Sequence, residues 1–182
     1  MIIFFNYLYR TTYREMASDL VDKVLSVNTS IDKKDLKPSS TLNIPLHGRD
    51  GYTANLPIRL SQQFKVSITV AKRLASAYGG YAQEVCQIAE KEPKYAEYLL
   101  PGQPYIKAEV IYSVRHEWAR KAEDIIARRI RLAFLDKQNA IKAVPVVVDL
   151  MGDELKWNTA KRKEEKDKCL KFLEHFGGPV PK

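Results

Sequence analysis

The residues whose types are best suited to binding or catalysis are six cations between residues 115 and 131. The same segment also contains three acids. The cations are Arg115, Arg120, Lys121, Arg128, Arg129 and Arg131, and the acids are Glu117, Glu123 and Asp124. Arginine forks suit the recognition of phosphate or carboxylate groups. Glu123 and Asp124, however, lie near the helical spacings that pair with Arg128 and Arg120. The pattern therefore favours surface or interhelix ion pairs, with anion binding as the alternative.

One histidine and three aromatic residues accompany these cations. His116 could act as a general base, as histidines often do, but a lone histidine among ion pairs is more often a hydrogen-bonded structural residue. Tyr105, Tyr112 and Trp118 have the ring faces needed to stack on nucleic-acid bases. Their helical spacing favours packing in a core instead. A second basic run lies near the C-terminus and is typical of a solvated helix face: Lys156, Lys161, Arg162, Lys163, Lys166, Lys168 and Lys171.

Other patterns for catalysis or metal binding are absent from the sequence. The two cysteines, Cys86 and Cys169, are far apart, and the three histidines assemble no zinc spacing with them. There is no strand-linked G-x-G-x-x-G, no P-loop and no G-x-S-x-G elbow. We therefore expect no catalytic residue and no metal ligand, and we expect two buried thiols in a reducing compartment.

Composition places the chain among ordinary globular proteins. It has 182 residues, of which 45% are hydrophobic and 29% are charged, so it is long enough to bury a real core. The formal net charge of +8 favours an anionic partner: phosphate, nucleic acid or an acidic lipid surface. The apolar run at residues 1–9 is far shorter than the ~20 residues of a spanning helix. It also lacks the basic flank of a secretory signal.

Hydrophobic periodicity predicts a mainly α protein, a single bundle-like domain of about seven helices, with a long irregular loop near residues 28–65. Helices are expected from Thr12, with a capping box, and from Ser67 to the exit at Gly79-Gly80. The most regular pattern, Ala122 to Phe134, predicts a continuous helix. We expect Asp136 to cap the next helix and Pro145 to interrupt it and start another. Asn158 or Thr159 is expected to open the last helix.

Two segments carry a family resemblance. Residues 105–117 (YIKAEVIYSVRHE) and 127–136 (ARRIRLAFLD) resemble the C-terminal domain of FAD-dependent glycerol-3-phosphate dehydrogenases and the related glycerophosphate oxidases. Residues 11–17 (TTYREMA) resemble the passage from the flavin-binding to the helical domain of that family. The likeness extends over nearly everything after residue 10. It divides the chain into an unrelated or truncated leader, 1–10, and a helical C-terminal domain, 11–182.

The resemblance implies an enzyme that oxidises glycerol 3-phosphate to dihydroxyacetone phosphate and passes electrons through FAD to quinone. It places Thr11 and Thr12 at the flavin edge. The Gly-Gly-Lys segment that precedes this point in the family is replaced here by Tyr7, Leu8 and Tyr9. We therefore expect a fragment that lacks the FAD-binding domain, retains no FAD by itself and is inactive alone.

The expected partner is the FAD-binding domain of the same enzyme type, and the resemblance also admits a homodimer and a membrane surface, with no nucleic acid expected. It implies the mitochondrial inner membrane in a eukaryote or the cytoplasmic membrane face in a bacterium, although no targeting signal is visible. The alternative hypothesis is a non-enzymatic basic helical module that binds nucleic acid or an anionic membrane surface.

Overall fold

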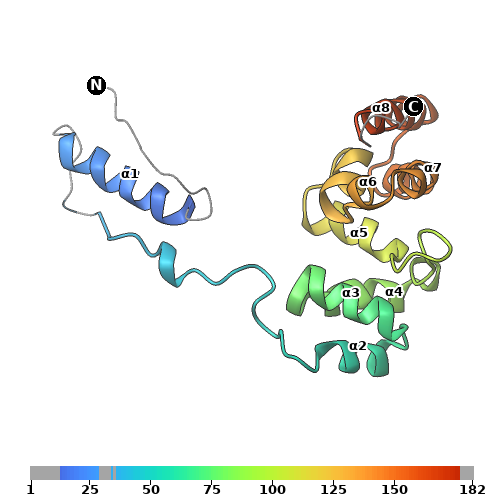
Figure 1. The fold of residues 1–182 in the computed structure, drawn as a ribbon, viewed down its shortest axis with the longest axis horizontal. Coiled ribbons are helices and arrows are strands. Elements are labelled where there is room, and N and C mark those ends of the chain that lie inside the picture. Colours follow the sequence, from blue (N-terminus) through green and yellow to red (C-terminus); the bar gives the residue numbers. More distant parts are fainter. Residues whose placement is uncertain (1–12, 29–33, 35, 177–182) are drawn as a thin grey trace, which may run out of the picture. The chain divides into compact units, whose positions relative to one another are not determined.

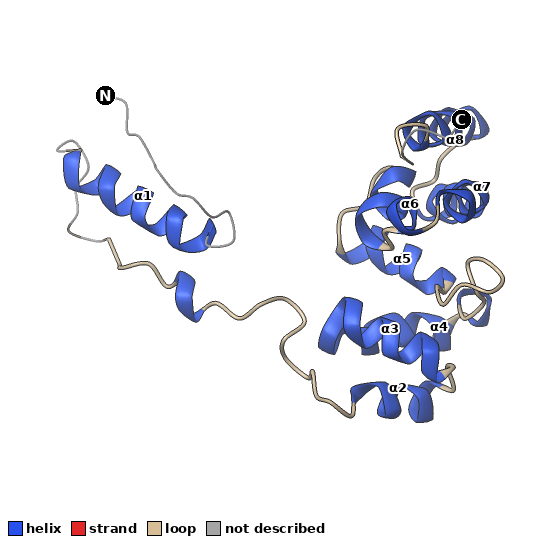
Figure 2. Cartoon of the chain, in the orientation of Figure 1, coloured by secondary structure: helices blue, strands red, loops and turns tan. Residues whose placement is uncertain are grey.

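The computed structural model describes residues 13–28, 34 and 36–176. This part of the chain is helical and contains no strand, only an isolated antiparallel bridge between Tyr98 and Ile106 (Figure 2). Its α-helices are α1 (Tyr13–Val27), α2 (Leu56–Phe64), α3 (Ile68–Tyr78), α4 (Ala82–Lys91), α5 (Lys107–His116), α6 (Leu132–Leu135), α7 (Lys137–Glu154) and α8 (Thr159–Leu173). The prediction of a mainly α fold is confirmed, with eight α-helices in the described residues where about seven were expected.

The chain forms two compact units, Met1–Leu46 and His47–Lys182. The first contains α1 and a short 3-10 helix, η2 (Thr41–Asn43), and the Arg14 guanidinium donates a hydrogen bond to the Ile44 carbonyl oxygen at 3.0 Å. No residue of α1 is buried, and its apolar stripe is largely in solvent, since Leu20 and Val21 are 40% and 55% exposed.

The second unit is built around α5. All seven residues from Ala108 to Val114 are buried, including the polar Glu109 and Ser113. Ile111 and Tyr112 pack against α2, α3 and α4, whereas Val110 and Val114 pack against α7, α8 and the segment between α5 and α7. Figure 1 shows α5 between these two groups of helices.

The α2–α4 group begins inside the region expected to be a loop. That irregular region ends at Asn55, because α2 buries Leu56 and Leu60 against α3 and α4. Its nine residues offer only two buried apolar side chains, which is too weak a periodic signal to identify from sequence. The predicted exit of α3 at Gly79-Gly80 is confirmed: a 3-10 turn, η3 (Gly79–Tyr81), links α3 to α4.

The expected interruption at Pro145 is wrong. Helix α7 runs through this proline from Lys137 to Glu154. A proline inside a helix removes one hydrogen bond and costs about 3 kcal/mol. The turns on both sides are buried, with Val144 before the proline and Val147, Val148 and Met151 after it. Burial of these side chains, at roughly 1.5–3 kcal/mol each, outweighs the loss.

The continuous helix expected from Ala122 to Phe134 is also wrong. The chain instead forms a π-helix, η5 (Asp124–Arg129), then Arg131 with a left-handed φ of 56°, and then the four-residue α6. Most apolar residues of the pattern are still buried, including Ile125, Ile126 and Ile130, but Phe134 is 62% exposed. The sequence pattern thus predicted the burial correctly except at Phe134, and predicted the helix geometry incorrectly.

Candidate functional site

Thr11 and Thr12, the predicted flavin-edge residues, lie outside the described residues, so their assignment stays a prediction. The described residues contain no strand followed by a glycine-rich turn and a helix, the arrangement that holds the pyrophosphate of a dinucleotide in doubly wound folds. Within the same residues, no group of three His, Cys, Asp or Glu side chains is placed to hold a metal ion. No helix among them combines the length and apolarity needed to cross a membrane.

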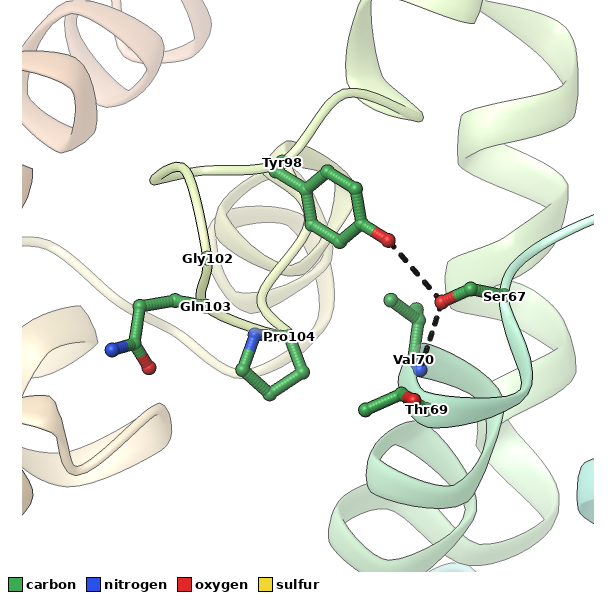
Figure 3. Close-up of a pocket in the computed structure, with 7 residues that line it drawn as sticks. All are labelled: Ser67, Thr69, Val70, Tyr98, Gly102, Gln103 and Pro104. Carbon is green, nitrogen blue, oxygen red and sulfur yellow. Dashed lines mark hydrogen bonds between the residues drawn. The ribbon is translucent and has the colours of Figure 1, made fainter.

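A first cavity, of about 380 Å³, lies between the start of α3 and the loop around Gly102 (Figure 3). The Ser67 hydroxyl accepts a hydrogen bond from the Val70 amide at 3.3 Å and another from the Tyr98 hydroxyl at 3.2 Å. Ser67 is thus the N-cap of α3, and the side chains lining this cavity are uncharged. These contacts fasten the loop to the helix and supply no base for a nucleophile.

A second cavity, of about 470 Å³, is lined by three arginines from three parts of the second unit. We call it the arginine pocket, and its polar and rim residues are Arg73, Ser76, Tyr105, Arg129, Arg131 and Leu135. Arg73 comes from α3, Arg129 ends η5, and Arg131 is the left-handed residue before α6. The lining of this pocket contains three cations and no acid.

Arg73 is held on one side of this pocket by a buried carboxylate. Its guanidinium is ion-paired with Glu109, which is 1% exposed, and its Nε donates to the Pro104 carbonyl oxygen at 3.2 Å. Glu109 also accepts hydrogen bonds from the Ile106 amide at 3.0 Å and the Tyr78 hydroxyl at 3.2 Å. Burial lowers the pKa of Arg73 from its usual value and raises that of Tyr78. The pair therefore joins α3 to α5 at the centre of the unit.

Arg129 is held on another side by Glu117. Its Nε lies 3.3 Å from the Glu117 Oε2 atom, and its Nη2 donates to the Glu117 carbonyl oxygen. The Ser113 hydroxyl donates to the same carboxylate at 2.9 Å. In contrast, the Arg131 guanidinium has neither a carboxylate partner nor a hydrogen bond among the described residues, and it lies 5.8 Å from the centre of the Phe134 ring.

Most other cations of the 115–131 segment form ion pairs, as the sequence favoured, but with different partners. Lys121 lies 3.6 Å from Glu123, and the Arg120 guanidinium donates to the carbonyl oxygens of Val114 and Ala119 instead of to a carboxylate. Arg115 contacts Glu154 of α7 at 2.6 Å, which raises the pKa of Arg115, and Arg128 pairs with Asp124. Burial opposes ionisation of Asp124, but the amides of Arg120 and Lys121, each at 3.0 Å, and the Arg128 guanidinium outweigh it and lower its pKa. These cations are parts of the architecture.

The aromatic neighbours divide into two kinds. Tyr105 and Tyr112 are buried, as the core interpretation predicted, but Trp118 is 79% exposed, with a φ of 57°. The core interpretation is therefore wrong for Trp118, which the chain presents to solvent just after α5 ends. His116 stacks on Tyr112 with ring centres 4.8 Å apart, consistent with a structural role.

The basic run of the last helix is a solvated face, as predicted. In α8 only Glu165, Cys169 and Leu173 are buried. Lys161 contacts Glu164 and Glu165 at 3.0 Å each, which is the i,i+3 and i,i+4 pairing of a surface helix. Both cysteines are buried, and burial raises the pKa of Cys86 and of Cys169 to about 12, so the expectation of two buried thiols is confirmed.

Sequence reasoning missed Arg73 as a member of the charged site. Arg73 lies in the polar part of an ordinary amphipathic pattern, 36 residues before Glu109. A buried-helix segment with an acid at its centre, as at Glu109, is the one signal that pointed to an unseen cationic partner.

Comparisons with known proteins agree with this fold and cover most of the chain. The family model for the C-terminal domain of alpha-glycerophosphate oxidase matches residues 39–162. The mitochondrial glycerol-3-phosphate dehydrogenases of Bos taurus and Homo sapiens are each 40% identical to the chain over 169 residues, which is 90% of this chain and 22% of each relative. The mitochondrial enzyme of Arabidopsis thaliana is 36% identical over 183 residues, 91% of this chain and 28% of the relative. No solved structure matches the chain, and no comparison supports the nucleic-acid-binding alternative.

Proposed function

This chain belongs to the family of the C-terminal domain of alpha-glycerophosphate oxidase, and from that membership we propose that it serves as the helical C-terminal domain of an FAD-dependent glycerol-3-phosphate dehydrogenase. The observation that carries the proposal is the 40% identity to mitochondrial glycerol-3-phosphate dehydrogenases over 90% of this chain. Because the chain spans only 22–28% of the length of these relatives, the activity of the whole enzyme is part of the proposal.

In the proposed enzyme, glycerol 3-phosphate is oxidised at C2 to dihydroxyacetone phosphate. The substrate gives up two electrons and two protons, and quinone takes them up to become quinol. FAD, when bound, supplies the redox chemistry between the two. The second unit, His47–Lys182, contributes a helical body. We propose that it docks onto the FAD-binding domain and that Thr11 and Thr12 lie at the flavin edge.

We further propose that this chain retains no flavin without that domain, and that 11–182 is the extent of the helical domain. The names of the relatives support a mitochondrial location. The same proposal extends to attachment to the inner membrane in a eukaryote, or to the cytoplasmic membrane face in a bacterium. It also extends to assembly as a homodimer.

A chimera tests the function directly. The 169-residue matched segment of the bovine enzyme is replaced by the corresponding part of this chain, and the purified chimera is assayed for bound flavin and for glycerol-3-phosphate-dependent reduction of a soluble quinone. The matched control deletes the same segment. We expect the chimera to retain FAD and oxidise substrate, and the deletion to do neither. A chimera without flavin, or with flavin and without activity, contradicts the proposed function.

A second experiment uses the chain by itself, without the FAD-binding domain. After incubation with excess FAD and desalting, we expect its visible spectrum to show no flavin band. A retained band that bleaches when glycerol 3-phosphate is added would overturn the proposal that the flavin is held by another domain.

A further inference from the structure

We propose that the arginine pocket is a binding site for the phosphate group of a small phosphate monoester, either a free metabolite or the headgroup of a lipid. The inference rests on the pocket's own residues, so it does not depend on the function proposed above. Its basis is an excess of positive charge at a cavity of suitable size. An unfavourable backbone conformation at Arg131 places one of these charges at the cavity.

The charge excess follows from the partners of the three arginines. Arg73 is paired with Glu109 and Arg129 with Glu117, whereas Arg131 has no acidic partner among the described residues. Three guanidinium charges thus meet two carboxylates, which leaves a net charge of +1 at the pocket. An anion there gains a charge-assisted hydrogen bond from Arg131, and the arginine fork matches phosphate geometry.

The cavity fits a ligand larger than the phosphate group itself. Its volume of about 470 Å³ lies within the usual range of small-molecule sites, ~300–1,000 Å³. Beside the arginines it is lined by Ala77, Ile130 and the 72% exposed Leu135, which offer apolar contact to the carbon part of an ester. The Ser76 hydroxyl adds a neutral hydrogen-bonding group.

The backbone conformation at Arg131 is energetically unfavourable. Its φ of 56° is unfavourable for any residue with a Cβ, by roughly 1–2 kcal/mol. The π-helix η5 ends two residues earlier, and π-helical turns often occur at functional sites. Buried Ile130 and Leu132 flank Arg131 and hold this geometry in the folded chain. The strain brings the one unpaired arginine of the pocket to its rim.

Two glycine substitutions test the site with a matched control. Arg131→Gly and Lys156→Gly each remove one positive charge and each relieve a left-handed φ of 56°, but only Arg131 lines the pocket. Both variants should therefore fold at least as stably as the wild-type chain. Binding is measured on the full chain by calorimetry with inorganic phosphate, and by co-sedimentation with phosphatidylcholine vesicles that carry phosphatidic acid.

We expect saturable phosphate binding with a Kd on the order of 1 mM or tighter. Arg131→Gly should weaken it roughly 10- to 100-fold, the effect of losing a hydrogen bond to a charged group, while Lys156→Gly should bind like wild type. Binding of inorganic phosphate identifies a free monoester as the source, and binding of the vesicles alone identifies a lipid headgroup. Absence of both, equal binding by Arg131→Gly, or equal weakening by both variants would overturn the proposal.

Discussion

Replacing Gly48 by alanine tests how the loop before α2 is fastened to the turn between α3 and α4. Gly48 has a φ of 83°, and an ideal Cβ on it would lie 2.5 Å from the Tyr78 carbonyl oxygen. That oxygen belongs to the backbone at the end of α3, so it cannot rotate away. The Gly80 amide also donates to the Gly48 carbonyl oxygen at 2.8 Å. Moving the loop to relieve the contact would therefore stretch this hydrogen bond.

The expected cost has two parts. A left-handed φ costs an L-residue about 1–2 kcal/mol, and overpacking against a fixed neighbour costs about 1–3 kcal/mol. Together they lower the free energy of unfolding of Gly48→Ala by about 2–5 kcal/mol. In a chain of this size each kcal/mol corresponds to about 2–4 °C in Tm, so we expect Tm to fall by roughly 4–20 °C.

Gly102→Ala is the matched control for the backbone term. Gly102 has a φ of 76°, and an ideal Cβ there meets no atom within 4 Å. Gly102→Ala should therefore lower the free energy of unfolding only by the backbone strain, about 1–2 kcal/mol. Thermal and urea unfolding of both variants, followed by far-ultraviolet circular dichroism, gives the comparison. If Gly102→Ala loses as much stability as Gly48→Ala, the close packing of the loop against α3 is refuted.

Three further outcomes follow from buried or hydrogen-bonded charges and thiols. Glu109→Gln leaves Arg73, whose side chain is 18% exposed, without its carboxylate partner and should cost up to about 3–5 kcal/mol in urea unfolding; a loss below about 1 kcal/mol would contradict the ion pair. Cys86 and Cys169, each with a pKa raised to about 12 by burial, should not react with a thiol reagent at pH 8 until the chain is unfolded, and rapid labelling of the native protein would disprove their burial. Asp124 has a lowered pKa in the folded chain, so its contribution to stability is present above its unfolded pKa of about 3.9 and is lost as the pH falls through the folded value. Asp124→Asn should therefore flatten the acid side of the curve of stability against pH, and an unchanged curve would contradict the assignment.

Local chemistry in the sequence was enough to predict several helix ends. Asp136 accepts a hydrogen bond from the Asn139 amide at 3.0 Å, and Asn158 accepts one from the Lys161 amide at 2.8 Å. Asp136 was predicted as a cap, and Asn158 was one of the two residues expected to open the last helix. In each cap the donor and acceptor are only three residues apart, so neighbouring residue types are enough to suggest it. The family resemblance was likewise readable from residues 105–117 and 127–136, and the comparisons confirmed it.

Longer-range features were decided by tertiary packing. Pro145 is a helix breaker by its own chemistry, yet burial of the valines around it keeps α7 continuous. The pattern from Ala122 to Phe134 is that of a regular helix, yet packing between α5 and α7 imposes a π-helix and a left-handed Arg131. The arginine pocket exists only because α3 and η5, more than 40 residues apart in the sequence, converge on it. Its net charge depends on which carboxylates reach which arginines, and these distances are set by the packing of helices rather than by the spacing of residues along the chain.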